Sequence, residues 1–97
     1  MAARSLDVSA AATADMSDIW RYTAERWSED RADGYYQGIA DALADLAAGD
    51  SIGIPVDVRP GVQKCLFNSH AIYFRVSGQT IQVLRILHQA MDAKRHL

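Results

Sequence analysis

The sequence predicts an α+β fold in which a short N-terminal strand and an antiparallel helical hairpin pack on a small, mostly antiparallel β-sheet. Apolar residues recur with a helical period between positions 9 and 49, and in short strand-like runs between positions 62 and 87. Turn-forming residues separate those runs. A chain of 97 residues buries one modest core, so residues 1–97 are expected to form a single domain.

The first elements are a strand and an amphipathic helix. Leu6 and Val8 alternate with polar residues, which predicts a short strand. Ser9 is a favourable N-cap for the helix that follows. The apolar side of that helix consists of Ala12, Met16, Ile19, Trp20, Thr23 and Trp27. Because these positions share one helical face, we expect a helix of about five turns.

A second helix follows almost without a linker. Ser28 is its predicted N-cap, Glu29 and Asp30 are favourable in its first turn, and Gly49 is its predicted stop. Its core stripe consists of Ala32, Tyr35, Tyr36, Ile39, Leu43 and Leu46. The short connection predicts that the two helices fold back as a hairpin.

Small residues recur beside this stripe at Gly34, Gly38 and Ala42. A glycine inside a helix costs about 1 kcal/mol relative to alanine, so two of them indicate a close approach of another backbone. We favour the first helix as the approaching element. A docking site for another chain is the alternative.

The second half of the chain reads as a loop and three strands. Residues 49–61 contain three glycines and both prolines, which is typical of a shaped loop. Val62–Phe67 and His70–Val76 are predicted to pair across a tight turn at Asn68–Ser69. After a turn at Ser77–Gly78, the apolar run over residues 81–87 predicts a strand covered on both faces.

Arg85 interrupts this last strand. Simple alternation places its side chain on the same face as Ile81, Val83 and Leu87. An interior arginine requires a partner or a surface that another molecule covers, and Asp92 is the obvious internal candidate.

The net charge of −2 is unevenly distributed. Residues 1–50 carry ten acids and four arginines, whereas residues 51–97 carry two acids and six basic residues. The basic second half favours an acidic partner, although the chain lacks the strongly basic balance of a dedicated nucleic-acid binder. No run approaches the roughly 18 apolar residues of a membrane span, and no secretory signal is visible. With Cys65 as the lone cysteine, the cytoplasm is the expected location.

Few residues carry a chemical signature. His70, His88 and His96 lack metal-ligand spacing, so neither a metal nor a cofactor is expected. Cys65 is interpreted as a packed residue and not as a nucleophile. A basic cluster remains near the C-terminus: Arg75, Arg85, His88, Lys94, Arg95 and His96, with Tyr73 nearby. It could cleave RNA, with His88 as general acid, or its arginines could bind carboxylates; composition and spacing favour the second interpretation.

Four segments resemble the ParE toxins of the RelE/ParE superfamily: SAAATADMSDIWRYT (9–23), VDVRPGVQKC (56–65), SHAIYFRV (69–76) and VLRILHQAMDAKRHL (83–97). The resemblance spans nearly the whole chain and implies the RelE/ParE-like fold. It also implies the toxin of a type II toxin–antitoxin system, which poisons DNA gyrase and is not an enzyme. The implied partner is a ParD-like antitoxin, which forms a hetero-oligomer with the toxin and wraps it with its C-terminal segment.

Relatives in the RelE branch are ribosome-dependent messenger-RNA endonucleases that use basic residues and tyrosines. Here Tyr73 is the only tyrosine on the predicted sheet and the C-terminal tail has none, which favours the non-nuclease interpretation. A toxin-derived subunit that has lost its toxicity is a third possibility.

The resemblance and the basic cluster lead to two sets of expected site residues. Antitoxin binding is assigned to Trp20, Tyr36, Tyr73, Arg75 and Arg85. Target binding is assigned to Arg59, His88, Met91, Arg95 and His96. We expect Arg85→Ala to weaken antitoxin binding far more than Arg26→Ala, with no membrane and no direct nucleic-acid contact involved.

Overall fold

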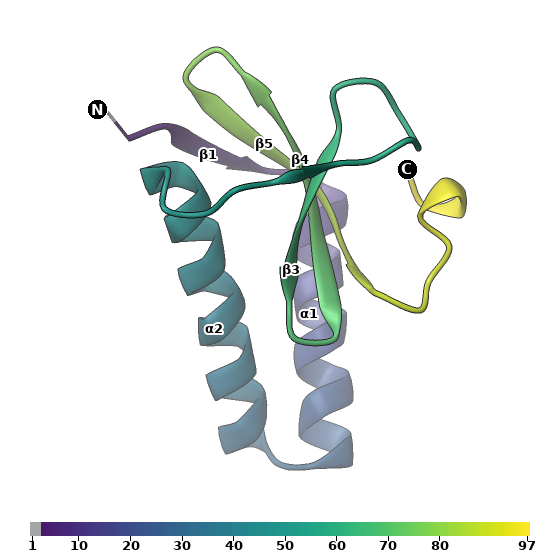
Figure 1. Ribbon diagram of the computed structural model, residues 1–97. Coiled ribbons are helices and arrows are strands. Elements are labelled where there is room, and N and C mark those ends of the chain that lie inside the picture. The colour runs from purple at the N-terminus through teal and green to yellow at the C-terminus, as the bar shows by residue number, and fades with distance from the viewer. Residues whose placement is uncertain (1–2) are drawn as a thin grey trace.

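Within residues 3–97, five strands form one mixed sheet in the order β1-β5-β4-β3-β2, and two antiparallel helices cover one of its faces (Figure 1). The computed structural model describes residues 3–97. Its elements are β1 (Ser5–Val8), α1 (Ala10–Arg26), α2 (Glu29–Ala48), β2 (Ile54–Pro55), β3 (Gln63–Phe67), β4 (His70–Ser77), β5 (Thr80–His88) and the 3-10 helix η1 (Ala93–Arg95). β1 pairs with β5 in parallel and the other pairs are antiparallel, which confirms the predicted fold class.

Side-chain caps set the helix boundaries where the sequence predicts them. The Ser9 hydroxyl accepts a hydrogen bond from the Ala12 N–H at 3.0 Å and donates one to the Leu84 carbonyl at 2.8 Å. The first bond starts α1, and the second fixes that start to β5. Ser28 caps α2 through the Arg31 N–H, and Gly49 ends it in the left-handed conformation at φ 84°.

The main core lies between the helices and the sheet. It contains Ala12, Met16, Ile39, Leu43, Leu46, Ile72, Phe74, Ile81, Val83 and Ile86. A second, smaller cluster lies on the opposite face of the sheet. It contains Val62, Ala71, Tyr73 and Leu87, with Val56, Leu84, Ala93 and Leu97 packed against it. Strand β5 is therefore covered on both faces, as predicted.

A β-bulge overturns the predicted orientation of Arg85. Tyr73 lies opposite Arg85, but the next residue of β4, Phe74, lies opposite Val83. The unpaired extra residue, Leu84, shifts the alternation of β5. Val83 and Ile86 consequently face the helices, while Arg85 lies opposite Tyr73 and shares a face with Leu87, but not with Ile81 and Val83 as simple alternation predicted.

Two predictions for the hairpin are also corrected. Trp27 is 59% exposed and Tyr36 is 41% exposed, so neither belongs to the core stripes. A Cβ atom at Gly38 would lie 2.6 Å from Cζ of Phe67, whereas one at Gly34 would meet nothing within 4 Å. The close approach at Gly38 is therefore a contact with Phe67 of β3 and not with α1. Among residues 3–97, no helix combines the length and the apolar character that crossing a membrane requires.

Candidate functional site

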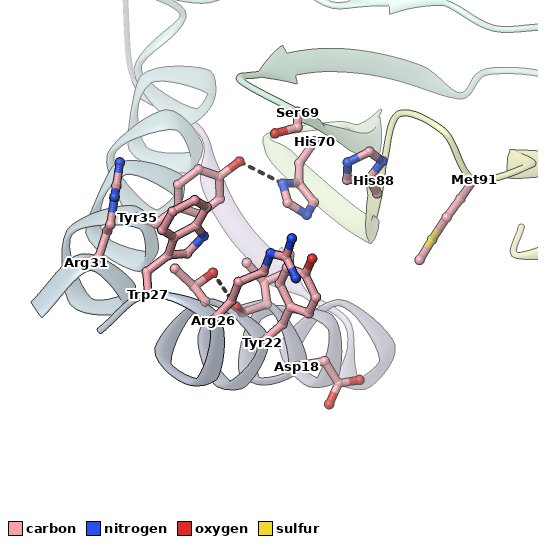
Figure 2. Close-up of a pocket in the computed structure, with 12 residues that line it drawn as sticks. Asp18, Tyr22, Arg26, Trp27, Arg31, Tyr35, Ser69, His70, His88 and Met91 are labelled. Carbon is pink, nitrogen blue, oxygen red and sulfur yellow. Dashed lines mark hydrogen bonds between the residues drawn. The ribbon is translucent and has the colours of Figure 1, made fainter. Parts of the chain in front are cut away.

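A pocket of about 650 Å³ opens between the hairpin and the end of the sheet where β4 begins and β5 finishes (Figure 2). We call it the histidine pocket. It is lined by Asp18, Ile19, Tyr22, Thr23, Arg26, Trp27, Arg31, Tyr35, Ser69, His70, His88 and Met91. The pocket thus combines residues from both helices, the β3–β4 turn and the C-terminal tail.

Two histidines form the polar side of this pocket. His70 and His88 are directly opposite each other in the β4–β5 pair, and their rings meet edge to face with centroids 5.4 Å apart. The Tyr35 hydroxyl lies 2.7 Å from Nδ1 of His70. The Ala90 N–H donates to Nδ1 of His88 at 3.0 Å. Because that nitrogen must accept, neutral His88 carries its proton on Nε2.

The surroundings of His70 favour its neutral form. Burial lowers the pKa of His70 below 6.5, and the neighbouring His88 lowers it further. Both effects have the same physical origin, because a charged imidazole loses solvation and meets a second group that can carry positive charge. Above its lowered pKa, His70 therefore presents a neutral imidazole beside the ring of His88.

Cationic and apolar groups surround the histidines. Arg26 and Arg31 line the pocket, and the Arg31 guanidinium lies 4.7 Å from the centroid of the Trp27 ring. Tyr22 is 63% exposed and Met91 is 49% exposed. Exposed large apolar groups around a concave site are typical of surfaces that another molecule covers. Chemically, the pocket suits a ligand that combines an anionic group with an apolar one.

Arg85 is engaged elsewhere. Its Nε and Nη2 donate to the two carboxylate oxygens of Asp15, each at 2.8 Å, and Asp15 also accepts from the Ile86 N–H at 2.9 Å. The hydrogen bond to Asp15 raises the pKa of Arg85 above its ordinary value. The remaining nitrogen, Nη1, donates to the His96 carbonyl at 3.1 Å. This pair ties β5 to α1 and to the tail.

The prediction of Asp92 as the internal partner of Arg85 is wrong. Asp92 instead accepts from the Lys94 N–H at 3.1 Å, and its carboxylate lies 3.9 Å from Nε of Arg95. The start of α1 lies against β5, where Ser9 bonds the Leu84 carbonyl, and this contact between distant segments brings Asp15 to Arg85. A requirement for Arg85 in antitoxin binding stays a prediction, now for a side chain that already has an internal carboxylate.

The residues assigned to antitoxin binding do not form one surface. Trp20 and Tyr36 line a shallow depression between the helices, where the Trp20 indole N–H donates to Asp33 at 2.9 Å. Tyr73 is buried in the second cluster. Arg75 is exposed, and its Nε donates to the side-chain oxygen of Gln82 at 2.6 Å.

The residues assigned to target binding divide in the same way. His88 and Met91 meet in the histidine pocket. Arg95 and His96 are exposed on the tail, and Arg59 is exposed in the loop before β3. The role of each set stays a prediction.

Sequence reasoning missed the contribution of Tyr22, Arg26 and Tyr35, and it did not pair His70 with His88. Only a partial signal for the pair was present, because the turn at Ser77–Gly78 by itself sets His70 opposite Leu87, and the bulge at Leu84 moves His88 into that place. The helical residues gave no such signal, because their neighbours depend on how the hairpin packs on the sheet.

Comparisons with known proteins support a common family. Residues 6–93 match the family described as ParE toxin of type II toxin-antitoxin system, parDE. The chain is 41% identical over 92 residues to Toxin ParE1 of Mycobacterium tuberculosis, covering 93% of this chain and 94% of that protein. It is 34% identical over 87 residues to Toxin ParE1 of Caulobacter vibrioides, covering 89% of this chain and 90% of that protein.

Solved structures show the same fold. A chain of the chromosomal ParDE toxin–antitoxin system from P. aeruginosa aligns with a TM-score of 0.79 and 28% identity, over 88% of this chain and 95% of that chain. The RelBE2 toxin–antitoxin complex from Mycobacterium tuberculosis contains a chain with a TM-score of 0.63 and 18% identity, over 94% of this chain and 97% of that chain. The second likeness concerns the fold alone.

Proposed function

This chain belongs to the ParE toxin family of type II toxin–antitoxin systems, and from that membership we propose that it arrests growth by poisoning DNA gyrase until a ParD-like antitoxin binds it. The observation that carries the proposal is the match to ParE toxins over residues 6–93. In this proposal the chain acts in the cytoplasm as a protein-binding toxin and is not an enzyme.

The state of Arg85 supports the non-enzymatic part of the proposal. In the nuclease interpretation this guanidinium stabilises the charge that develops on a phosphorane. Here the carboxylate of Asp15 already binds two of its nitrogens and offsets its charge. A phosphate would have to displace that carboxylate, so Arg85 is better suited to holding the fold than to catalysis.

The antitoxin partner is supported by charge and by likeness. Residues 51–97 carry six basic residues against two acids, a surface that an acidic partner complements. The similar structure from P. aeruginosa is described as a ParDE toxin–antitoxin system. We therefore expect a hetero-oligomer in which the antitoxin covers exposed apolar groups of the toxin.

An endoribonuclease is the second candidate, because one observation favours it. His70 and His88 lie side by side in a pocket that also contains two arginines. Two imidazoles can serve as general base and general acid in RNA cleavage. Primer extension on cellular transcripts after toxin induction separates the candidates. Cuts linked to codons would support the nuclease, and intact messages would remove it.

A supercoiling assay with purified gyrase tests the main proposal. We expect the toxin to inhibit supercoiling and to increase cleaved DNA, and we expect prior mixing with the product of the neighbouring open reading frame to prevent both effects. No inhibition at any stoichiometry would contradict the gyrase assignment. Expression of the toxin alone should arrest growth; continued growth would instead favour a subunit that has lost its toxicity.

A further inference from the structure

We propose that the histidine pocket is the anchor site of the antitoxin, which places a carboxylate against His70, His88 and Arg26 and an apolar side chain against Tyr22 and Met91. This inference rests on the proposed function, because it names the contact through which neutralisation occurs. It commits to an acidic, partly apolar protein segment as the occupant.

The charge of the pocket is opposite to that of the helices that build it. Residues 10–48 carry eight acids and only three arginines, yet two of those arginines, Arg26 and Arg31, line the pocket. Its single lining carboxylate, Asp18, lies 3.3 Å from Nη1 of Arg21. A short acidic side chain can therefore enter a locally basic site. A nucleic-acid strand would extend its many phosphates over the surrounding acidic hairpin, where they are repelled.

The imidazoles supply directed hydrogen-bond donors. The Ala90 N–H occupies Nδ1 of His88, which leaves the protonated Nε2 available to a carboxylate oxygen. The charged and titratable groups that line the pocket are Asp18, Tyr22, Arg26, Arg31, Tyr35, His70 and His88. An anion bound among them favours the protonated form of His70, whose Nδ1 faces a Tyr35 hydroxyl that can accept as well as donate. Docking should consequently take up protons.

The apolar half of the pocket fits an anchor residue. Ile19 and Thr23 contribute partly buried surface, while Tyr22, Trp27 and Met91 are large and exposed. In protein interfaces, a few anchor side chains that cover such groups in a concave site carry most of the binding affinity. The volume of about 650 Å³ accommodates more than one side chain of the partner.

Calorimetric titration of the toxin with the purified product of the neighbouring open reading frame tests the site. We expect Tyr22→Ala and Arg26→Gln each to raise Kd by about tenfold or more. The sequence alone treats Arg26 as an exposed comparison position, whereas its place in the pocket now assigns it to the contact. Leu66→Ala and Arg4→Gln are matched controls, because both positions are exposed and lie outside the pocket, and they should leave Kd nearly unchanged. All four changes are at exposed positions, and circular dichroism verifies folding. Equal effects in pocket and control variants would overturn the proposal.

Proton uptake tests the role of the imidazoles. Titrations near pH 7 in two buffers of different ionisation enthalpy should show net proton uptake on binding, and Kd should be lower at pH 6 than at pH 8. The variant His70→Gln should reduce this uptake, and circular dichroism verifies that it folds. A binding enthalpy that is independent of the buffer would overturn the placement of a carboxylate against these histidines.

Single-stranded RNA is the probe for the alternative occupant. If the pocket variants lost affinity for RNA but bound the antitoxin normally, the pocket would belong to nucleic acid and the proposal would fail. Growth assays separate this inference from the proposed function. If the chain is toxic but its pocket variants bind the antitoxin normally, only the inferred anchor site is wrong. If the chain binds the antitoxin through the pocket but never arrests growth, only the proposed function is wrong.

Discussion

At the scale of single residues, the pair between Arg85 and Asp15 links three parts of the chain that are distant in sequence. The side chain of Arg85 is 24% exposed and that of Asp15 is 12% exposed. Asp15 also satisfies the Ile86 N–H next to the β-bulge. The Asp15 carboxylate therefore binds both the Arg85 guanidinium and the Ile86 N–H. Removing this carboxylate would leave both groups without a partner.

We expect Asp15→Asn to lower the free energy of unfolding by about 2–4 kcal/mol, because it strands a mostly buried guanidinium. Asp18→Asn is the matched control on the same helix. Asp18 and Arg21 form a pair with side chains 69% and 65% exposed, so its loss should cost about 0–1 kcal/mol. Urea denaturation of both variants measures the difference. Similar small losses would show that the buried pair contributes little.

The lowered pKa of His70 predicts sensitivity to acid. The unfolded chain protonates this histidine near pH 6.5, whereas the folded chain does so only at lower pH. Between those values the unfolded state binds more protons, so this contribution to stability is complete above pH 6.5 and is lost as pH falls. We expect the melting temperature to drop between pH 7.5 and 5.5, and to drop less in His70→Phe. The control His96→Gln, at an exposed position, should follow the wild type. An equal drop in His70→Phe would contradict this origin.

At the scale of elements, Gly38, which has no side chain, allows α2 to lie close to the sheet. A Cβ atom at Gly38 would lie 2.6 Å from the ring of Phe67, and that ring also packs edge to face on Tyr35 with centroids 5.3 Å apart. The ring therefore cannot move without disturbing the wall of the histidine pocket. Helix propensity alone would favour alanine at this position, but packing opposes it.

Two glycine substitutions on the same helix should have opposite effects. Gly34→Ala meets open space and should raise the free energy of unfolding by up to about 1 kcal/mol through helix propensity. Gly38→Ala should lower it by about 1–3 kcal/mol because it overpacks the contact with Phe67. Thermal melts of both variants make the comparison. Stabilisation by both would mean that the Phe67 ring moves aside at little cost.

At the scale of the whole molecule, the sheet separates two surfaces with different coverage. The helical hairpin covers one face, and the tail after β5 covers part of the other through Ala93 and Leu97 (Figure 1). The Arg85 contact to the His96 carbonyl fixes the tail further. This arrangement leaves the side chains of Arg95 and His96 exposed on a segment that is held in place by these contacts.

We expect Arg95→Ala to reduce growth arrest strongly while leaving folding and antitoxin binding intact. Its side chain is 84% exposed and lies 3.9 Å from the Asp92 carboxylate, so its removal should change stability by no more than about 1 kcal/mol. Arg21→Ala, at an exposed position on α1, is the control and should remain toxic. Colony counts after induction, combined with a thermal melt, give the result. Full toxicity of Arg95→Ala would remove this residue from the target-binding set.

The sequence by itself determined the order of the two helices and the four longer strands, the helix caps at Ser9 and Ser28, the stop at Gly49 and a central strand covered on both faces, but not the short β2 or η1. These features follow from local propensity and periodicity, which adjacent residues encode directly. Tertiary structure decided where side chains from distant segments meet. The bulge at Leu84 resets the faces of β5, and the docking of α1 on that strand brings Asp15 to Arg85, seventy positions away in the chain. The histidine pocket likewise exists only because the docked hairpin brings α1 and α2 beside His70 and His88, a contact that depends on packing geometry and leaves no periodic signal.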